Sequence, residues 1–197
     1  MKTIRLFTLS FLVLFLSNLY SFGSLQERTK SFDVNKGDNL VVNVDPGNII
    51  INVWSKSEVF IKAKGIDDDE VENLKMTQSG STVKVVFESD LGWSDNTEFE
   101  ISVPAEFNLD LVTTGGNVDV TGNLTGAVEV STQGGNVGFA DIDGNLKVHT
   151  SGGNIITGDL KGEAKLTTMG GNVSVGKVSG GNTTISSMGG NIIVKDG

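Results

Sequence analysis

Few residues in this chain have the side chains on which catalysis or metal binding usually depends. His149 is the only histidine, and cysteine is absent, which excludes disulfides, thiolate catalysis and cysteine-ligated metals. A histidine base needs a partner that orients it, and no serine or carboxylate pattern around His149 indicates one. We therefore expect His149 to be a surface side chain on the outward side of a strand. The sequence predicts no catalytic residues, no metal ligands and no cofactor-binding residues.

Charged residues recur at one position of successive strand-like segments: Asp110, Glu129, Lys147 and Lys165. A pair of carboxylates can hydrolyse glycosidic bonds, so a carbohydrate-active enzyme is one hypothesis. The combination of lysine or arginine with aspartate that polysaccharide lyases use is not found. A solvated face, on which an acidic pair lies beside a basic pair, is the simpler interpretation of these side chains.

Two further groups of side chains have the chemistry to bind a ligand. Trp93 lies in a polar loop between Asp90 and Asn96, and an exposed tryptophan can stack on a sugar ring. The alternative is that Trp93 covers a small core. The acidic run of residues 67–70 has oxygen ligands that suit calcium, but contiguous acids more often form a solvated turn. Trp93 is therefore the candidate for a ligand contact.

The composition narrows the classes of partner. The chain has 197 residues, enough for one domain or two small ones, and 24 acidic against 15 basic residues give a net charge of −9. A nucleic-acid-binding protein needs a basic surface, which this balance argues against. Electrostatic binding to anionic lipid is disfavoured for the same reason.

The N-terminal segment has the pattern of an export signal. Lys2 and Arg5 precede an apolar run over residues 6–16, and small residues stand at the −3 and −1 positions of a cleavage site between Gly23 and Ser24. The apolar run is too short to span a membrane as a helix. The pattern predicts a signal peptide over residues 1–23 and a protein in the periplasm, on the outer cell surface or in the medium, without a stable membrane span after cleavage.

A Gly-Gly-Asn motif recurs five times in the second half of the chain, at steps of 19, 18, 18 and 19 residues. Pro46-Gly47-Asn48 has the same surroundings. Such a spacing is typical of repeat architectures. The asparagines of these motifs are expected to form a structural ladder at the corners of successive coils, in the left-handed conformation that a sharp corner needs: Asn48, Asn117, Asn136, Asn154, Asn172 and Asn191.

Apolar residues alternate with polar ones on both sides of each motif, as in strands with one buried face. A hydroxyl residue stands two positions before each glycine pair, and these residues are expected to form a second structural ladder, directed inward: Thr113, Thr132, Thr150, Thr168 and Ser187. Asparagine and hydroxyl ladders are typical of stacked, in-register strands.

These patterns predict an all-β fold, a single-stranded β-helix (β-solenoid) with coils of 18–19 residues and an irregular N-terminal β section. Residues 24–37 are expected to be a lead-in and residues 38–197 one solenoid domain, irregular over 38–110 and regular over 111–197. A hairpin is predicted across residues 79–82. The chain stops soon after the fifth motif, so we expect an open strand edge that favours self-association through the solenoid ends.

The stretch from Phe99 to Val120 contains an apolar strand that ends in Val-Pro, a second strand and a Gly-Gly-Asn corner. With the repeated corners that follow, it resembles the bacterial putative-adhesin family of exported β-strand-repeat β-helix proteins. The resemblance implies a right-handed β-helix and supplies no catalytic motif. It favours an exported, non-enzymatic surface or envelope protein that binds an unknown glycan or protein ligand through exposed strand faces. The alternative is a self-assembling envelope scaffold similar to bactofilins.

Overall fold

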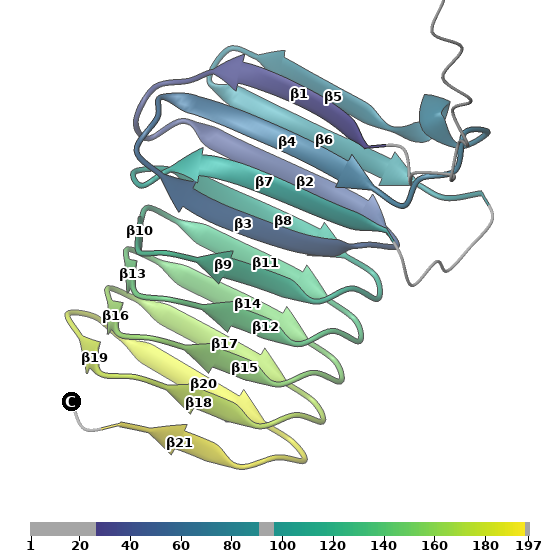
Figure 1. Ribbon diagram of the computed structural model, residues 1–197. Helices are drawn as coiled ribbons and strands as arrows, with labels where there is room; N and C mark the ends of the chain where they lie inside the picture. Colours follow the sequence, from purple (N-terminus) through teal and green to yellow (C-terminus); the bar gives the residue numbers. More distant parts are fainter. Residues whose placement is uncertain (1–26, 91–96, 196–197) are drawn as a thin grey trace, which may run out of the picture.

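The computed structural model describes residues 27–90 and 97–195, and Figure 1 shows how their strands are stacked. The predicted signal peptide over residues 1–23, its cleavage site and Trp93 lie outside the described residues. Within the described ranges the fold is all-β with mixed sheets, and the one helical element is a short 3-10 helix, η1 (Val71–Asn73). No helix in this part of the chain has the length and hydropathy of a membrane-spanning segment.

The described strands form three sheets. The nine-stranded sheet contains, in spatial order, β1 (Arg28–Asp33), β4 (Glu58–Lys64), β7 (Glu98–Pro104), β3 (Asn48–Trp54), β9 (Val118–Thr121), β12 (Val137–Phe139), β15 (Ile155–Thr157), β18 (Val173–Val175) and β21 (Ile192–Val194). The eight-stranded sheet contains β20 (Thr183–Ser187), β17 (Ala164–Thr168), β14 (Leu146–Thr150), β11 (Val128–Thr132), β8 (Asn108–Thr113), β2 (Asn39–Asp45), β6 (Thr82–Glu88) and β5 (Lys75–Ser79). The four-stranded sheet contains β10 (Leu124–Thr125), β13 (Ile142–Asp143), β16 (Leu160–Lys161) and β19 (Val178–Ser179).

From residue 108 onward the chain visits each sheet in turn and then returns to the first. Strand β11 pairs in parallel with β8 on one side and β14 on the other, so that Val128 is the partner of both Leu109 and Leu146. The partners are 19 and 18 residues apart in sequence, which is the spacing of the Gly-Gly-Asn motifs. We call the segment from one such motif to the next a unit. Successive units therefore stack with equivalent residues side by side.

The core lies between the nine-stranded and eight-stranded sheets, and Leu124, Ile142 and Leu160 of the four-stranded sheet also belong to it. Alternate residues of each strand point inward, as the pleat of a strand requires, and inward residues of successive units form apolar columns. One column consists of side chains with at most 1 % exposure: Val118, Val137, Ile155 and Val173. Each buried aliphatic side chain of this size contributes about 1.5–3 kcal/mol. The columns are parts of one continuous core, which extends into the N-terminal region.

The N-terminal region joins the same stack but departs from its regular pairing. Strand β2 pairs in parallel with β8, and β3 with β9, although the partners are about 69 residues apart in sequence. The intervening segment adds β7 beside β3 and β4 antiparallel to β7, and the first strand of the described chain, β1, pairs antiparallel with β4. Strands β5 and β6 form the predicted antiparallel hairpin, which is confirmed. The sheets are thus mixed at this end and parallel from β8 and β9 onward.

The corners differ from the expected geometry. No described residue other than glycine has a positive φ, so the prediction of left-handed asparagines is wrong. The second glycine of each pair is needed for another reason, because a Cβ on Gly135 would lie 1.9 Å from the carbonyl oxygen of Gly116 in the preceding unit. Positive φ angles occur instead at the glycine that directly follows each strand of the four-stranded sheet, such as Gly162 after β16, with φ 130°. The asparagine corner is therefore tight because backbones approach each other, and no unusual dihedral angle is involved.

Candidate binding face

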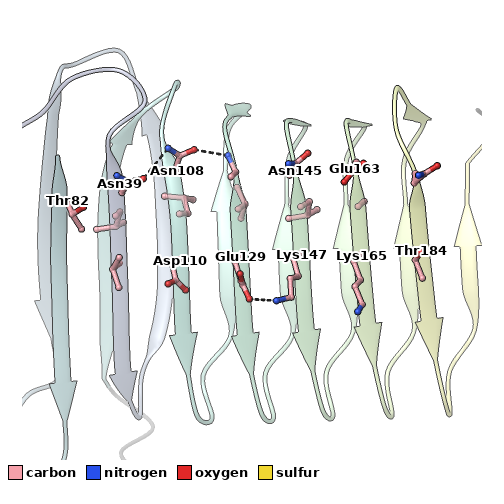
Figure 2. A pocket seen from close by; sticks show the side chains of 18 residues that line it. Asn39, Thr82, Asn108, Asp110, Glu129, Asn145, Lys147, Glu163, Lys165 and Thr184 are labelled. Atoms are coloured by element: carbon pink, nitrogen blue, oxygen red, sulfur yellow. Dashed lines mark hydrogen bonds and ion pairs between the residues drawn. The ribbon is translucent and has the colours of Figure 1, made fainter.

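A groove of about 730 Å³ runs across the outer side of the eight-stranded sheet, close to the beginnings of its strands. Figure 2 shows that the labelled side chains come from neighbouring strands and form rows perpendicular to them. The first row is mostly amide and carboxylate: Asn39, Asn108, Asn145, Glu163 and Asn182. Strand register determines the rows, because equivalent residues of stacked units lie side by side.

The second row contains the four charged residues singled out by their spacing. Asp110 pairs in register with Glu129, Glu129 with Lys147, and Lys147 with Lys165, which confirms the predicted acidic pair beside a basic pair. Lys147 Nζ lies 2.6 Å from Glu129 Oε1. Asp110 and Lys165, at the two ends of this charged row, form no ion pair with any described residue.

The charged row is accessible to solvent. The side chains of Glu129 and Lys147 are 54 % and 59 % exposed even though they pair with each other. A carboxylic acid that donates a proton near neutral pH usually needs an apolar, water-poor pocket that raises its pKa. The charged row is instead a solvated surface on which acidic and basic side chains lie next to one another.

A smaller depression of about 290 Å³ covers the four-stranded sheet. Lys161 Nζ lies 2.7 Å from Asp143 Oδ2 on its surface. Asp141 Oδ1 accepts the backbone N–H of Asp159 at 2.9 Å, and Asp159 Oδ1 accepts that of Lys177 at 2.8 Å. Sequence reasoning missed this aspartate column. Its signal was the 18-residue step between two aspartates at the same distance from a Gly-Gly-Asn motif.

The six corner asparagines lie in one column. The Oδ1 atom of each accepts the backbone N–H of the asparagine in the next unit, at 2.8–2.9 Å, from Asn48 through Asn172. The Nδ2 group of Asn154 also donates to Oδ1 of Asn136 at 3.0 Å. These contacts join the units to one another and leave the outer face of the column to solvent.

The hydroxyl residues form a second column, on the inner side of the same corner. Each hydroxyl donates to the carbonyl oxygen of the second corner glycine in the preceding unit, at 2.8–3.0 Å: Thr113, Thr132, Thr150, Thr168 and Ser187 (for Thr113 the acceptor is Gly47). Each also accepts the backbone N–H three residues ahead. The four threonines are buried, so these bonds satisfy backbone groups that water cannot reach.

The remaining candidates do not form a site in the described structure. His149 is exposed between Ser131 and Thr167, its register partners. The acidic run of residues 67–70 is divided, because Asp68 pairs with Arg28 at 2.9 Å and the buried Glu70 accepts a hydrogen bond from Ser89 at 2.6 Å. No group of three or more potential metal ligands occurs among residues 27–90 and 97–195.

Two ionisable groups on the outer side of the nine-stranded sheet have shifted pKa values. Hydrogen bonds from Lys64 to Glu98 and Glu100, at 2.8 and 3.1 Å, raise the pKa of the lysine well above its usual range. Partial burial raises the pKa of Asp119 above 3.8. Its carboxylate extends across Gly138, where a Cβ would lie 2.4 Å from Asp119 Oδ1. Sequence reasoning missed the Lys64 cluster, since its antiparallel pairing has no fixed spacing.

Comparison with known proteins gives distant structural likenesses. The chain is similar to a putative cell adhesion protein from Clostridium sporogenes, with 11 % identity, a TM-score of 0.48, and coverage of 87 % of this chain and 99 % of that one. It is similar to a putative adhesin from Bacteroides fragilis, with 11 % identity, a TM-score of 0.38, and coverage of 88 % and 98 %. A putative lipid binding protein from Parabacteroides distasonis has 11 % identity, a TM-score of 0.29, and coverage of 85 % and 97 %.

No protein-family model matches the chain. No curated protein matches it. The structural likenesses are too distant to assign an activity or a partner to this protein.

Proposed function

We propose that the chain is an exported, non-enzymatic surface or envelope protein of the adhesin type, which binds a glycan or protein partner through exposed strand faces. In this proposal the stacked units are the coils of a single-stranded, right-handed β-helix. The observation that carries the proposal is the long groove on the eight-stranded sheet, with its in-register rows of polar and charged side chains.

The face suits binding to an extended partner for two reasons. Its rows follow the stacking direction, so a polymer or a strand can contact equivalent side chains about every 4.8 Å. Its side chains are carried by paired strands over a packed core, which reduces the entropy that binding costs. The charged residues of the groove are exposed, and the interaction therefore depends on many weak contacts along a surface.

The test begins with the location of the protein. Intact cells that express it are treated with protease, and the protein is detected with an antibody against residues 24–197. Cleavage while the cells stay whole supports exposure on the surface. Cleavage only after the envelope is opened overturns the surface adhesin.

A matched pair of variants then tests the binding face. Glu129→Ala with Lys147→Ala removes the ion pair of the groove and leaves the net charge unchanged. Asp143→Ala with Lys161→Ala removes a similar pair from the four-stranded sheet. The purified proteins are applied to immobilised glycans and matrix proteins. We expect the groove variant to lose retention and the control to keep it; equal retention of both, or no retention of the natural protein, contradicts binding through the groove.

A second candidate is a self-assembling envelope scaffold. The outer edge of β21 pairs with no described strand, and the side chains that continue the core columns there, Ile192 and Val194, are each 45 % exposed. An exposed apolar strand edge favours pairing with another chain. Filaments seen by electron microscopy, and lost in an Ile192→Lys variant, would support the scaffold; a monomer in size-exclusion chromatography with light scattering at high concentration contradicts it.

A further inference from the structure

The order of charges in the row on the eight-stranded sheet has a symmetry of its own. Along β8, β11, β14 and β17 the outward residues are Asp110, Glu129, Lys147 and Lys165, which is acid, acid, base, base (Figure 2). The next outward residues at the two ends are uncharged, Val41 on β2 and Thr184 on β20. A half-turn about an axis that lies over the sheet, parallel to the strands and between β11 and β14, therefore exchanges every acid with a base.

We propose that this face binds a second copy of the same chain in a two-fold symmetric dimer, in which the stacks of the two copies run in opposite directions. In such an isologous contact, residue i of one copy meets residue j of the other, and j meets i. The half-turn places Asp110 opposite Lys165 of the second copy, and Glu129 opposite its Lys147. The inference does not depend on the proposed adhesin function, since it concerns the purified protein.

The two end charges are the ones that a partner must neutralise. Glu129 and Lys147 already pair within the chain at 2.6 Å, whereas Asp110 and Lys165 have no ion-pair partner among the described residues. They are separated by three strand steps, about 14 Å. A second copy supplies opposite charges at the same separation and in the reverse order.

The neighbouring rows do not oppose this arrangement. In the row toward the strand ends the side chains are Val112, Ser131, His149, Thr167 and Ser186. The row toward the strand beginnings includes one charged residue, Glu163. The half-turn sets Glu163 opposite Asn108 of the second copy, so no like charges meet. A parallel arrangement would instead place acids on acids, which is repulsive.

The contact area predicts a weak dimer. Six strands at about 4.8 Å spacing and five residues at about 3.4 Å each give a face of roughly 490 Å² in projection. A stable interface usually buries about 800 Å² on each partner. The dimer is therefore expected only at high protein concentration, and it should weaken as salt screens the exposed charges.

Reversing the charge of Asp110 or of Lys165 distinguishes an effect on dimer formation from an effect on folding. Asp110→Lys places a lysine beside Glu129, and Lys165→Asp places an aspartate beside Lys147, so each change improves a cross-strand pair within the chain. Each change also creates two like-charge contacts in the dimer. We expect each variant to fold at least as stably as the natural protein and to associate about tenfold more weakly or worse. Asp69→Lys, an exposed site near η1, is the charge-matched control for Asp110→Lys and should associate normally.

The decisive measurement is sedimentation equilibrium of the two variants, alone and mixed. In the mixed dimer the changed side chain of D110K meets the changed side chain of K165D, and the unchanged Asp110 meets the unchanged Lys165, so both contacts are attractive. We expect the mixture, and the double variant D110K/K165D, to recover association at the natural level. A natural protein that stays monomeric at the highest concentration overturns the proposal and leaves the row for a ligand with paired opposite charges. A mixture no stronger than its components overturns it too.

Discussion

The Thr150 hydroxyl donates a hydrogen bond of 2.9 Å to the carbonyl oxygen of Gly135, across the step between two stacked units. The hydroxyl oxygen of Thr150 also accepts the backbone N–H of Gly153 at 3.2 Å, and Thr150 is fully buried. One side chain thus satisfies two backbone groups at a corner where the chain has no strand partner for them. The side chain joins one unit to the previous one as well as closing its own turn.

Thr150→Val is therefore expected to destabilise the protein. The replacement keeps the shape but leaves a buried carbonyl and a buried N–H unsatisfied, at a cost of about 1–3 kcal/mol for each unpaired group. Thr150→Ser keeps the hydroxyl and should cost about 0.8 kcal/mol for the lost methyl group. Urea unfolding followed by circular dichroism measures both. A valine variant as stable as the serine variant would show that the hydroxyl column is dispensable.

The two glycines of one corner should respond very differently to alanine. A Cβ on Gly135 would lie 1.9 Å from the carbonyl oxygen of Gly116, whereas on Gly134 the nearest atom would be 3.9 Å away. Neither residue has a positive φ. We expect Gly135→Ala to cost more than about 3 kcal/mol, because two backbones must separate. Gly134→Ala should be neutral or stabilising by up to about 1 kcal/mol. Thermal unfolding of the pair tests this, and similar midpoints would contradict the close-approach explanation.

Each asparagine of the corner column should contribute moderately to the free energy of unfolding. Asn154 accepts from the backbone of Asn172 at 2.8 Å and donates to Asn136 at 3.0 Å. Asn154→Ala removes these bonds at an exposed corner, and we expect a loss of about 1 kcal/mol. Asn145→Ala is the control, because that exposed side chain forms no hydrogen bond with a described residue and its loss should be nearly neutral. Hydrogen exchange of the Asn172 amide gives a local readout, and unchanged protection in Asn154→Ala would refute the role of this bond.

Asp119 should make stability depend on pH in a defined direction. Burial raises its pKa in the folded state above 3.8, so the unfolded state loses its proton first as pH rises. The contribution of Asp119 to stability is therefore fully present below pH 3.8. It is lost as pH rises through the pKa that the group has in the folded state. Asp119→Asn should be more stable than the natural protein at about pH 7, and the difference should vanish below pH 3.8. Unfolding free energies across this range test it, and a constant difference would exclude titration of Asp119 as the cause.

The regular part of the fold can be predicted because its information is local and repeated. Val118 and Val137 occupy the same place in their units, and the 19-residue step alone predicts that they are neighbours. The position of β4 could not be predicted in this way. Its antiparallel pairing between β1 and β7 depends on contacts between segments without a common spacing.

The same distinction applies to the candidate site. The order of Asp110, Glu129, Lys147 and Lys165 follows from the repeat step, and the structure places them in that order. The groove itself could not be predicted, since the repeat step gives the order of residues along a face and not the shape of that face. Residue type alone predicts a left-handed conformation for the corner asparagines, but the close stacking of Gly116 on Gly135 determines that corner instead.

The parallel pairing of successive units also determines how the protein responds to mechanical force. Backbone hydrogen bonds between units run along the stack, so tension applied between its two ends acts on every interface between units, and we expect the outermost unit, which is paired on one side only, to detach first. Each unit of 18 residues then releases about 60 Å of extended chain at roughly 3.3–3.6 Å per residue. The molecule lengthens in a series of similar steps, and the work of extension is dissipated over a distance many times the height of the folded stack.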